Sequence, residues 1–132
     1  NKKIEDLLEH NLDTKWLWVV HSETSTGVLN DLDRLKKICL KRNVQICVDC
    51  VSSLGTVPLD FNGVYLGSGV SGKGLASYPG LSFVFYNHEI MSSNSIPRYL
   101  DIGFYHQSEG IPFTISSNLI YALGEALKAC FN

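Results

Sequence analysis

Apolar and polar positions along the chain form short apolar runs separated by a helical pattern. The apolar runs predict four β-strands, over residues 16–21, 44–50, 63–68 and 81–87. Between the first two runs, Leu32, Leu35, Ile38 and Cys39 recur at helical spacing, which predicts a surface helix. Strands that alternate with helical segments are typical of an α/β fold with a mostly parallel sheet flanked by helices.

The ends of these elements carry further signals. Asn30 or Asp31 is the expected N-cap of the first helix, and a second helix is expected over 119–131. About a dozen residues separate the second and third strands, which is enough for a crossover between parallel strands. The segment 91–114 is polar and interrupted by prolines, so it is predicted to be mostly irregular.

Composition narrows the class of protein. The chain has 132 residues, 45% hydrophobic and 18% charged, which suits one soluble domain. Its formal net charge of -2 argues against nucleic acid and anionic membranes as partners. No apolar run approaches the roughly 20 residues of a membrane span, and the first ten residues lack the apolar centre of a signal peptide. We therefore expect a cytoplasmic protein.

Four cysteines raise the question of a disulfide, a redox pair or a zinc site. Cys47 and Cys50 form a C-x-x-C within a predicted strand, where positions three apart point to opposite faces. We therefore expect these two, with Cys39 and Cys130, to be buried and reduced. The histidines are too scattered to suggest a metal site, so none is predicted.

Three polar loops follow the first three predicted strands. They begin with HSETSTG, DCVSSLG and GSGVSGKG, and ligands of α/β sheets bind where parallel strands end. Asp49 ends an apolar strand, where a carboxylate needs a positive partner, and Lys73 lies in the third loop. The two could meet in one pocket, and on residue types alone a simple ion pair is the more common explanation.

The third loop also resembles a nucleotide-binding P-loop. Gly67, Gly72 and Lys73 match the pattern G-x-x-x-x-G-K-[ST]. Gly74 stands where a Ser or Thr hydroxyl should hold magnesium. A degenerate P-loop domain therefore remains an alternative.

Three ordered segments carry a stronger resemblance. HSETSTGVLN (21–30), VDCVSSLGTVPLD (48–60) and SGKGLASYPGLSFV (71–84) resemble the middle of class V aminotransferases of the fold-type I pyridoxal phosphate family. Within it, the chain is similar to alanine:glyoxylate, serine:pyruvate and 2-aminoethylphosphonate transaminases, and IPFTISSN (111–118) extends the match. The resemblance implies transfer of an amino group from a small amino donor to a 2-oxo acid or related aldehyde.

The resemblance also assigns roles to residues. Lys73 would form a Schiff base with the aldehyde of pyridoxal 5'-phosphate and then move a proton as general base and acid. Asp49 would pair with the pyridine nitrogen and keep the ring an electron sink. Thr24 falls where a hydroxyl lies near the phenolic oxygen of the cofactor, and Val51 where an apolar side chain packs on the ring. Ser71 is a further cofactor-binding position.

Two more implications concern the whole enzyme. Thr114 matches a position that reaches the cofactor phosphate of the neighbouring subunit, which implies a homodimer with composite sites. Residues 1–132 would be a fragment of the cofactor-binding large domain, without its N-terminal part and the C-terminal small domain. The upstream phosphate-binding helix start, the ring-stacking aromatic and the substrate-binding arginine would lie outside these residues, so we expect little transaminase activity from them alone.

Some positions depart from the family or have simpler roles. Gly72 replaces the polar residue, usually Gln, that precedes the lysine and can contact the phosphate. Glu23 is expected to fix its loop by accepting backbone hydrogen bonds. Two roles are open for His21: contact with the cofactor region, or structural hydrogen bonding of its loop. A non-catalytic scaffold with the same fold is the second alternative function.

Overall fold

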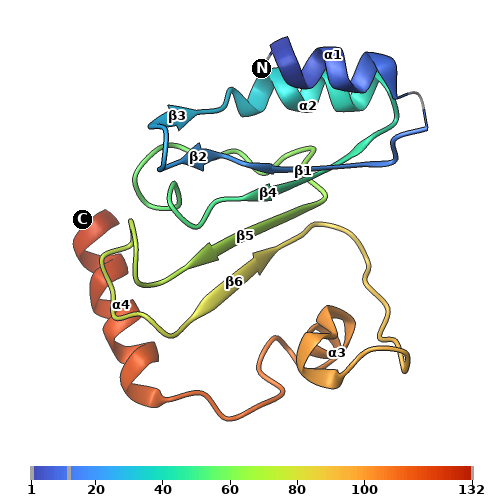
Figure 1. The fold of residues 1–132 in the computed structure, drawn as a ribbon. Helices are drawn as coiled ribbons and strands as arrows, with labels where there is room; N and C mark the ends of the chain where they lie inside the picture. The colour runs from blue at the N-terminus through green and yellow to red at the C-terminus, as the bar shows by residue number, and fades with distance from the viewer. Residues whose placement is uncertain (1, 12, 132) are drawn as a thin grey trace.

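The computed structural model describes residues 2–11 and 13–131 and has an α/β architecture (Figure 1). A four-stranded sheet in the order β1-β4-β5-β6 forms its centre. In chain order the elements are α1 (Lys2–His10), β1 (Trp16–Val20), β2 (Ser22–Glu23), β3 (Val28–Leu29), α2 (Leu32–Lys41), β4 (Gln45–Asp49), β5 (Leu66–Val70), β6 (Ser82–Phe85), the 3-10 helix η1 (Arg98–Leu100), α3 (Ile102–Gln107) and α4 (Ser117–Phe131). β1, β4 and β5 are parallel and β6 is antiparallel to β5, so the predicted fold class is confirmed.

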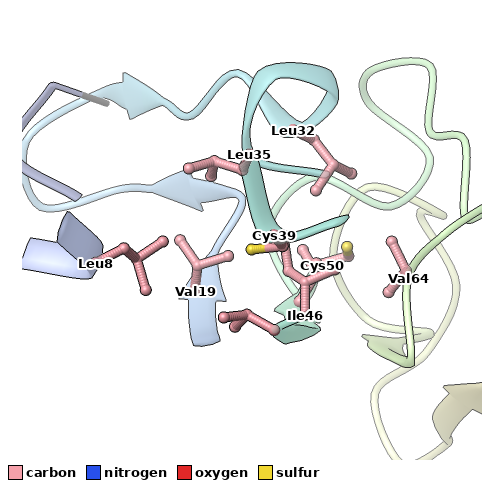
Figure 2. Packing of buried hydrophobic residues seen from close by; sticks show 10 residues of the cluster. Leu8, Val19, Leu32, Leu35, Cys39, Ile46, Cys50 and Val64 are labelled. Carbon is pink, nitrogen blue, oxygen red and sulfur yellow. The ribbon is translucent and has the colours of Figure 1, made fainter. Parts of the chain in front are cut away.

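The main core lies between α2 and one face of the sheet. Leu35 and Cys39 of α2 and Ile46 of β4 are almost completely buried, and Figure 2 shows them gathered with Val19 of β1. Full burial of a leucine-sized side chain contributes about 1.5–3 kcal/mol. The apolar, β-branched sequences of β1 and β4 supply this face, and both strands lie within one residue of their predicted ends.

The observed starts of α2 and α4 agree closely with the helix starts predicted from the sequence. Asp31 is the N-cap of α2, where its side chain accepts a hydrogen bond of 2.9 Å from the Arg34 backbone N–H. α4 begins two residues before its predicted start.

α1 was not predicted, because its nine residues are mostly polar. Leu8 of α1 is buried in the core, and Glu5 forms an ion pair with Arg34 of α2, so packing on α2 stabilises this helix.

The third strand differs most from its prediction. It was expected over 63–68, and β5 instead spans Leu66–Val70, with Gly67 and Gly69 on the core face. A Cβ at either glycine would overlap Phe61 or Leu54 of the preceding connection, so the missing side chains let that connection lie on the sheet. Strand propensity favours Val64 and Tyr65, so the prediction placed this strand two to three residues too early in the chain. The fourth strand was expected over 81–87, and β6 is shorter at both ends.

The segment 91–114 is mostly irregular, as predicted, but residues 98–100 and 102–107 form η1 and α3, which the sequence did not predict. Asp101 organises this segment although it is only 2% exposed. Its carboxylate accepts hydrogen bonds from Ser92 Oγ (2.5 Å), the Ser93 backbone N–H (2.9 Å) and the Phe104 backbone N–H (3.2 Å). The hydrogen bond from Ser92, followed by the backbone donors, holds the pKa of Asp101 below its usual value despite burial.

The cysteines follow the prediction with one exception. Cys39, Cys47 and Cys50 are free and buried, and burial raises the pKa of each thiol. Cys130 is also free but exposed, so the expectation of burial is wrong for this residue. It lies on α4, which exposes much of its surface, including Ile120 and Tyr121.

Candidate functional site

The carboxyl ends of β1, β4 and β5 form the edge where the sequence placed a ligand site. Val20 at the end of β1 pairs with Asp49 at the end of β4, and Asp49 pairs with Ser68 of β5. The His21 backbone N–H donates to the Asp49 carbonyl oxygen at 2.9 Å, which continues the parallel pairing beyond β1. Asp49 is thus the central residue of this edge, between the two neighbouring strands.

The Asp49 carboxylate is half-buried and held in place by its own turn. Its Oδ1 accepts a hydrogen bond of 2.8 Å from the Val51 backbone N–H. This contact fixes the side chain over the turn that begins at Val51, which is itself half-buried. Within the described residues no further hydrogen bond or ion pair to the carboxylate is found, so its second oxygen is available to a donor.

Lys73 lies in the loop of residues 71–81, which joins β5 to β6. Its side chain is exposed, and its carbonyl oxygen accepts a turn hydrogen bond of 2.9 Å from the Ala76 backbone N–H. No carboxylate of the described chain lies within 4.0 Å of its amine, so the simple ion pair with Asp49 is not present. The Lys73 amine is therefore free to react or to bind an anion.

Close backbone packing holds the 71–81 loop against the turn that follows Asp49. A Cβ at Gly74 would overlap the Leu54 carbonyl oxygen and the side chain of Thr56. From the other side, a Cβ at Gly55 would lie 2.8 Å from the Gly74 carbonyl carbon. The backbone next to Lys73 thus lies directly on residues 54–56, and this contact brings the Asp49 and Lys73 segments together at one edge.

This contact should be sensitive to any side chain added at Gly74. Replacing Gly74 by alanine should destabilise the protein by about 1–3 kcal/mol, because the new methyl group forces the loop away from Leu54. Gly124 on α4 offers a matched control, since a Cβ there meets nothing within 4 Å. Chemical denaturation of both variants measures the effect. Equal stability of the Gly74→Ala and Gly124→Ala proteins would contradict the proposed contact.

Ser71 lies at the base of this loop and is completely buried. Its hydroxyl donates to the Tyr78 carbonyl oxygen at 2.7 Å and accepts from the Leu81 backbone N–H at 3.2 Å. Both partners belong to the same loop, so the hydroxyl is engaged inside the protein. The sequence offered no signal for this arrangement, because both partners are backbone groups.

The loop after β1 forms a small hairpin of β2 and β3, and Thr24 is exposed in its turn. Glu23 accepts hydrogen bonds from Ser25, at 2.9 Å from the backbone N–H and 2.6 Å from the hydroxyl. These bonds lower the pKa of Glu23. The prediction that Glu23 fixes the loop is therefore confirmed, whereas the role of Thr24 stays a prediction.

Thr114 lies on a separate part of the molecule. It is exposed in the connection between α3 and α4, directly after Phe113, whose ring packs against three aromatic side chains: those of Tyr99, Phe104 and Tyr105. No contact joins it to Asp49 or Lys73 in the described part of the chain. The structure thus gathers Asp49, Val51, Ser71 and Lys73 at one edge and leaves Thr114 outside this group.

His21 is buried at the same edge, with 6% of its surface exposed. Its Nδ1 has no hydrogen-bond partner among the described residues, and burial lowers its pKa. The folded protein therefore binds a proton at this site less readily than the unfolded chain does. The backbone hydrogen bonds of His21 to Asp49 and Asn30 agree with its structural role, and contact with the cofactor region stays a prediction.

This burial makes stability depend on pH. As the pH falls below about 6.5, the unfolded chain takes up a proton at His21 before the folded protein does, so the free energy of unfolding should decrease. A His21→Asn variant should show a smaller decrease between about pH 7 and pH 5. Denaturation curves across this range measure both proteins. Parallel pH profiles would show that His21 does not contribute.

The loop geometry does not support the P-loop alternative. A P-loop joins a strand to a helix whose N-terminus faces the phosphates. Here the loop after β5 leads through turns into β6, an antiparallel strand, without a helix between them. In addition, close packing at Gly74 leaves no room for the hydroxyl-bearing side chain that would bind magnesium.

Among the described residues, no group of three or more His, Cys, Asp or Glu side chains could hold a metal ion. None of the described helices is long and apolar enough to cross a membrane.

Known proteins with similar sequences include aminotransferases. A family model described as Aminotransferase class-V matches residues 1–93. A protein named soluble hydrogenase, small subunit, from a Synechococcus species is 40% identical over 126 residues, covering 87% of this chain and 33% of that protein. A 2-aminoethylphosphonate–pyruvate transaminase from Bacteroides fragilis is 28% identical over 134 residues, covering 94% of this chain and 37% of that protein.

Solved structures include a similar fold. The crystal structure of an alanine–glyoxylate aminotransferase from a Nostoc species matches with a TM-score of 0.76 and 32% identity. The match covers 97% of this chain and 37% of that one. The chain thus spans about a third of the length of the curated relatives it matches.

Proposed function

Because the chain belongs to the class V aminotransferase family, we propose that the protein containing it is a pyridoxal phosphate-dependent transaminase. The observation that carries this proposal is the contact of Gly74 with the 54–56 turn, which holds the Lys73 loop beside the turn of Asp49. An amine and a carboxylate on neighbouring loops of one sheet edge are the two groups that this cofactor requires.

The residues at this edge fit the cofactor. Lys73 has an exposed amine without an ion-pair partner among the described residues, and Asp49 has an oxygen available to a protonated ring nitrogen. Val51 is half-buried beside Asp49, where an apolar side chain can cover a flat ring. Pyridoxal phosphate, when bound, supplies an aldehyde for attachment and a ring that takes up the electron pair left when the substrate carbon loses its proton.

In this proposal each residue has a defined task. The Nζ of Lys73 would hold the cofactor through its aldehyde group and, as a free amine, would move a proton at the substrate carbon. Asp49 would keep the ring nitrogen protonated, which would also compensate the cost of burying its carboxylate. Thr24 would contribute a hydroxyl to the phenolic oxygen, and Val51 would supply an apolar side chain to the ring.

The substrates are a small amino donor and a 2-oxo acid or related aldehyde. The names of the Bacteroides and Nostoc relatives support this class. Since the chain spans about a third of its relatives, we assign residues 1–132 to the cofactor-binding large domain of a longer protein. The side chains that select the donor then lie elsewhere in that protein.

The proposal includes the oligomeric state of the protein. We assign a homodimer in which Thr114 reaches the cofactor phosphate of the neighbouring subunit. Support comes from the apolar side chains exposed around it, Ile111, Phe113 and Ile115, which a partner could cover. The three buried free thiols suit a reducing cytoplasmic setting.

An amino-donor screen tests the proposed function. The complete protein, incubated with pyridoxal phosphate, should convert at least one small amino donor and one oxo acid into the corresponding exchanged products. Failure with the common amino acids and with aminophosphonates, despite bound cofactor, would favour the alternative of a non-catalytic scaffold.

A further inference from the structure

Ser71 closes the loop that carries Lys73. The Ser71 backbone N–H donates to the Leu81 carbonyl oxygen at 3.0 Å, and its carbonyl oxygen accepts from the Ser77 backbone N–H at 3.1 Å. Together with its hydroxyl bonds to Tyr78 and Leu81, these contacts join the two arms of the loop at its base. One buried residue therefore links the start of the loop to three positions near its end.

The hydrogen bonds of the hydroxyl limit what it can do for a ligand. A serine hydroxyl has one proton to donate, and Ser71 donates it to the Tyr78 carbonyl oxygen. A phosphate or phenolate oxygen is an acceptor and needs that proton. The residue is also completely buried, so a ligand cannot reach the hydroxyl without opening the loop.

We propose that Ser71 is a positioning residue for the Lys73 amine and not a contact to the cofactor. This inference rests on the proposed function, since it concerns the lysine that would carry the cofactor. Lys73 stands two residues after Ser71, and the loop is fixed elsewhere by Gly74 on the 54–56 turn and by Gly80 against Leu119 of α4. The hydroxyl is the side-chain group that ties the base of this loop together.

Loss of the hydroxyl has a clear physical consequence. In Ser71→Ala the Tyr78 carbonyl and the Leu81 N–H lose a buried partner, so the arms of the loop separate more often. The Lys73 amine then spends less time where an aldehyde can reach it, and attachment becomes slower. Because this effect acts through the loop, the slowing should be the same for an aldehyde with a phosphate group and for one without it.

Ser77 provides a matched control within the same loop. Its hydroxyl is buried and has no hydrogen-bond partner in the described part of the protein. Ser77→Ala thus removes the same atom from the same loop without removing a bond. It should leave loop opening and cofactor attachment close to those of the unmodified protein.

The experiment uses the complete protein without cofactor and two aldehydes, pyridoxal phosphate and pyridoxal. The rate at which borohydride-stable adduct appears on Lys73 is measured by mass spectrometry for Ser71→Ala, Ser77→Ala and the unmodified protein. We expect Ser71→Ala to slow both aldehydes by a similar factor, on the order of tenfold. Hydrogen exchange of the cofactor-free protein should also show faster exchange at the Leu81 amide in Ser71→Ala only.

Other results would overturn the inference. Slowing confined to pyridoxal phosphate would mean that Ser71 contacts the phosphate, and unchanged rates with both aldehydes would mean that it does not position Lys73. If the unmodified protein forms no Lys73 adduct at all, the proposed function fails first and this inference with it. Should Ser71→Ala not fold, Ser71→Cys, which keeps a weak donor and acceptor, must give the same uniform slowing.

Discussion

Replacing Lys73 by alanine should lower the rate of transamination by the complete protein about 10³-fold or more. In the proposed function, this variant loses both the amine that would attach the cofactor and the group that would move the proton at the substrate carbon. Because Lys73 is exposed and makes no ion pair within the described chain, its removal should leave stability almost unchanged. Rapid-mixing kinetics of the amino-donor half-reaction measure the rate, and thermal denaturation measures the stability.

Lys41→Ala is the matched control for this substitution. Lys41 is also an exposed lysine, but it ends α2 shortly before the start of β4, whereas the candidate site lies at the other end of that strand. The control protein should react at the rate of the unmodified enzyme. Transamination by Lys73→Ala within a few-fold of that of Lys41→Ala would remove Lys73 from the mechanism.

Asp49→Asn should give the second largest effect, a decrease of about 10²–10³-fold in the same half-reaction. Asparagine keeps the shape of the side chain and an oxygen that can accept the Val51 N–H bond, but it removes the charge that is proposed to hold a ring nitrogen protonated. The loss should therefore fall on the rate of proton removal more than on cofactor binding. Measuring both quantities separates the electrostatic role from a structural one.

An exposed aspartate outside the site serves as the control. Asp60 pairs with Lys36 on the surface, with an oxygen to nitrogen distance of 3.0 Å. Asp60→Asn should leave the half-reaction unchanged. If Asp49→Asn reacts as fast as Asp60→Asn, the ring-nitrogen role of Asp49 is wrong.

The sequence predicted the elements whose stability comes from their own apolar pattern. β1 is a continuous apolar run, β4 has an apolar centre at residues 46–48, and α2 has both helical spacing and an aspartate N-cap, so each prediction lies close to the observed ends. The predicted position of β5 was displaced because Gly67 and Gly69 have low strand propensity. These positions lack a side chain because Phe61 and Leu54 pack directly over them. Such contacts are visible only in three dimensions.

The helices that were missed depend on tertiary contacts. α3 has six residues and forms because the buried Asp101 side chain caps it and binds Ser92 and Ser93. α1 depends on packing against α2. Neither helix has a long enough periodic pattern to be predicted from local sequence.

In the candidate site, too, some features could be predicted from the sequence and others depend on tertiary contacts. The order of the strands and the motifs led to Asp49 and Lys73, and the structure gives the reason their segments meet, which is the contact between Gly74 and residues 54–56. The internal hydrogen bonds of Ser71 involve the backbone of Tyr78 and Leu81, for which the sequence has no signature. The roles of Thr24 and Thr114 rest on the resemblance, because the partners proposed for them belong to the cofactor or to another subunit.

Peptide mapping of the cofactor attachment point tests the central claim most directly. The complete protein is loaded with pyridoxal phosphate, reduced with borohydride and digested, and the modified peptide is identified by mass spectrometry. We expect a single adduct, on Lys73. An adduct on a different lysine, or protein that binds the cofactor without a reducible bond to Lys73, would contradict the assignment.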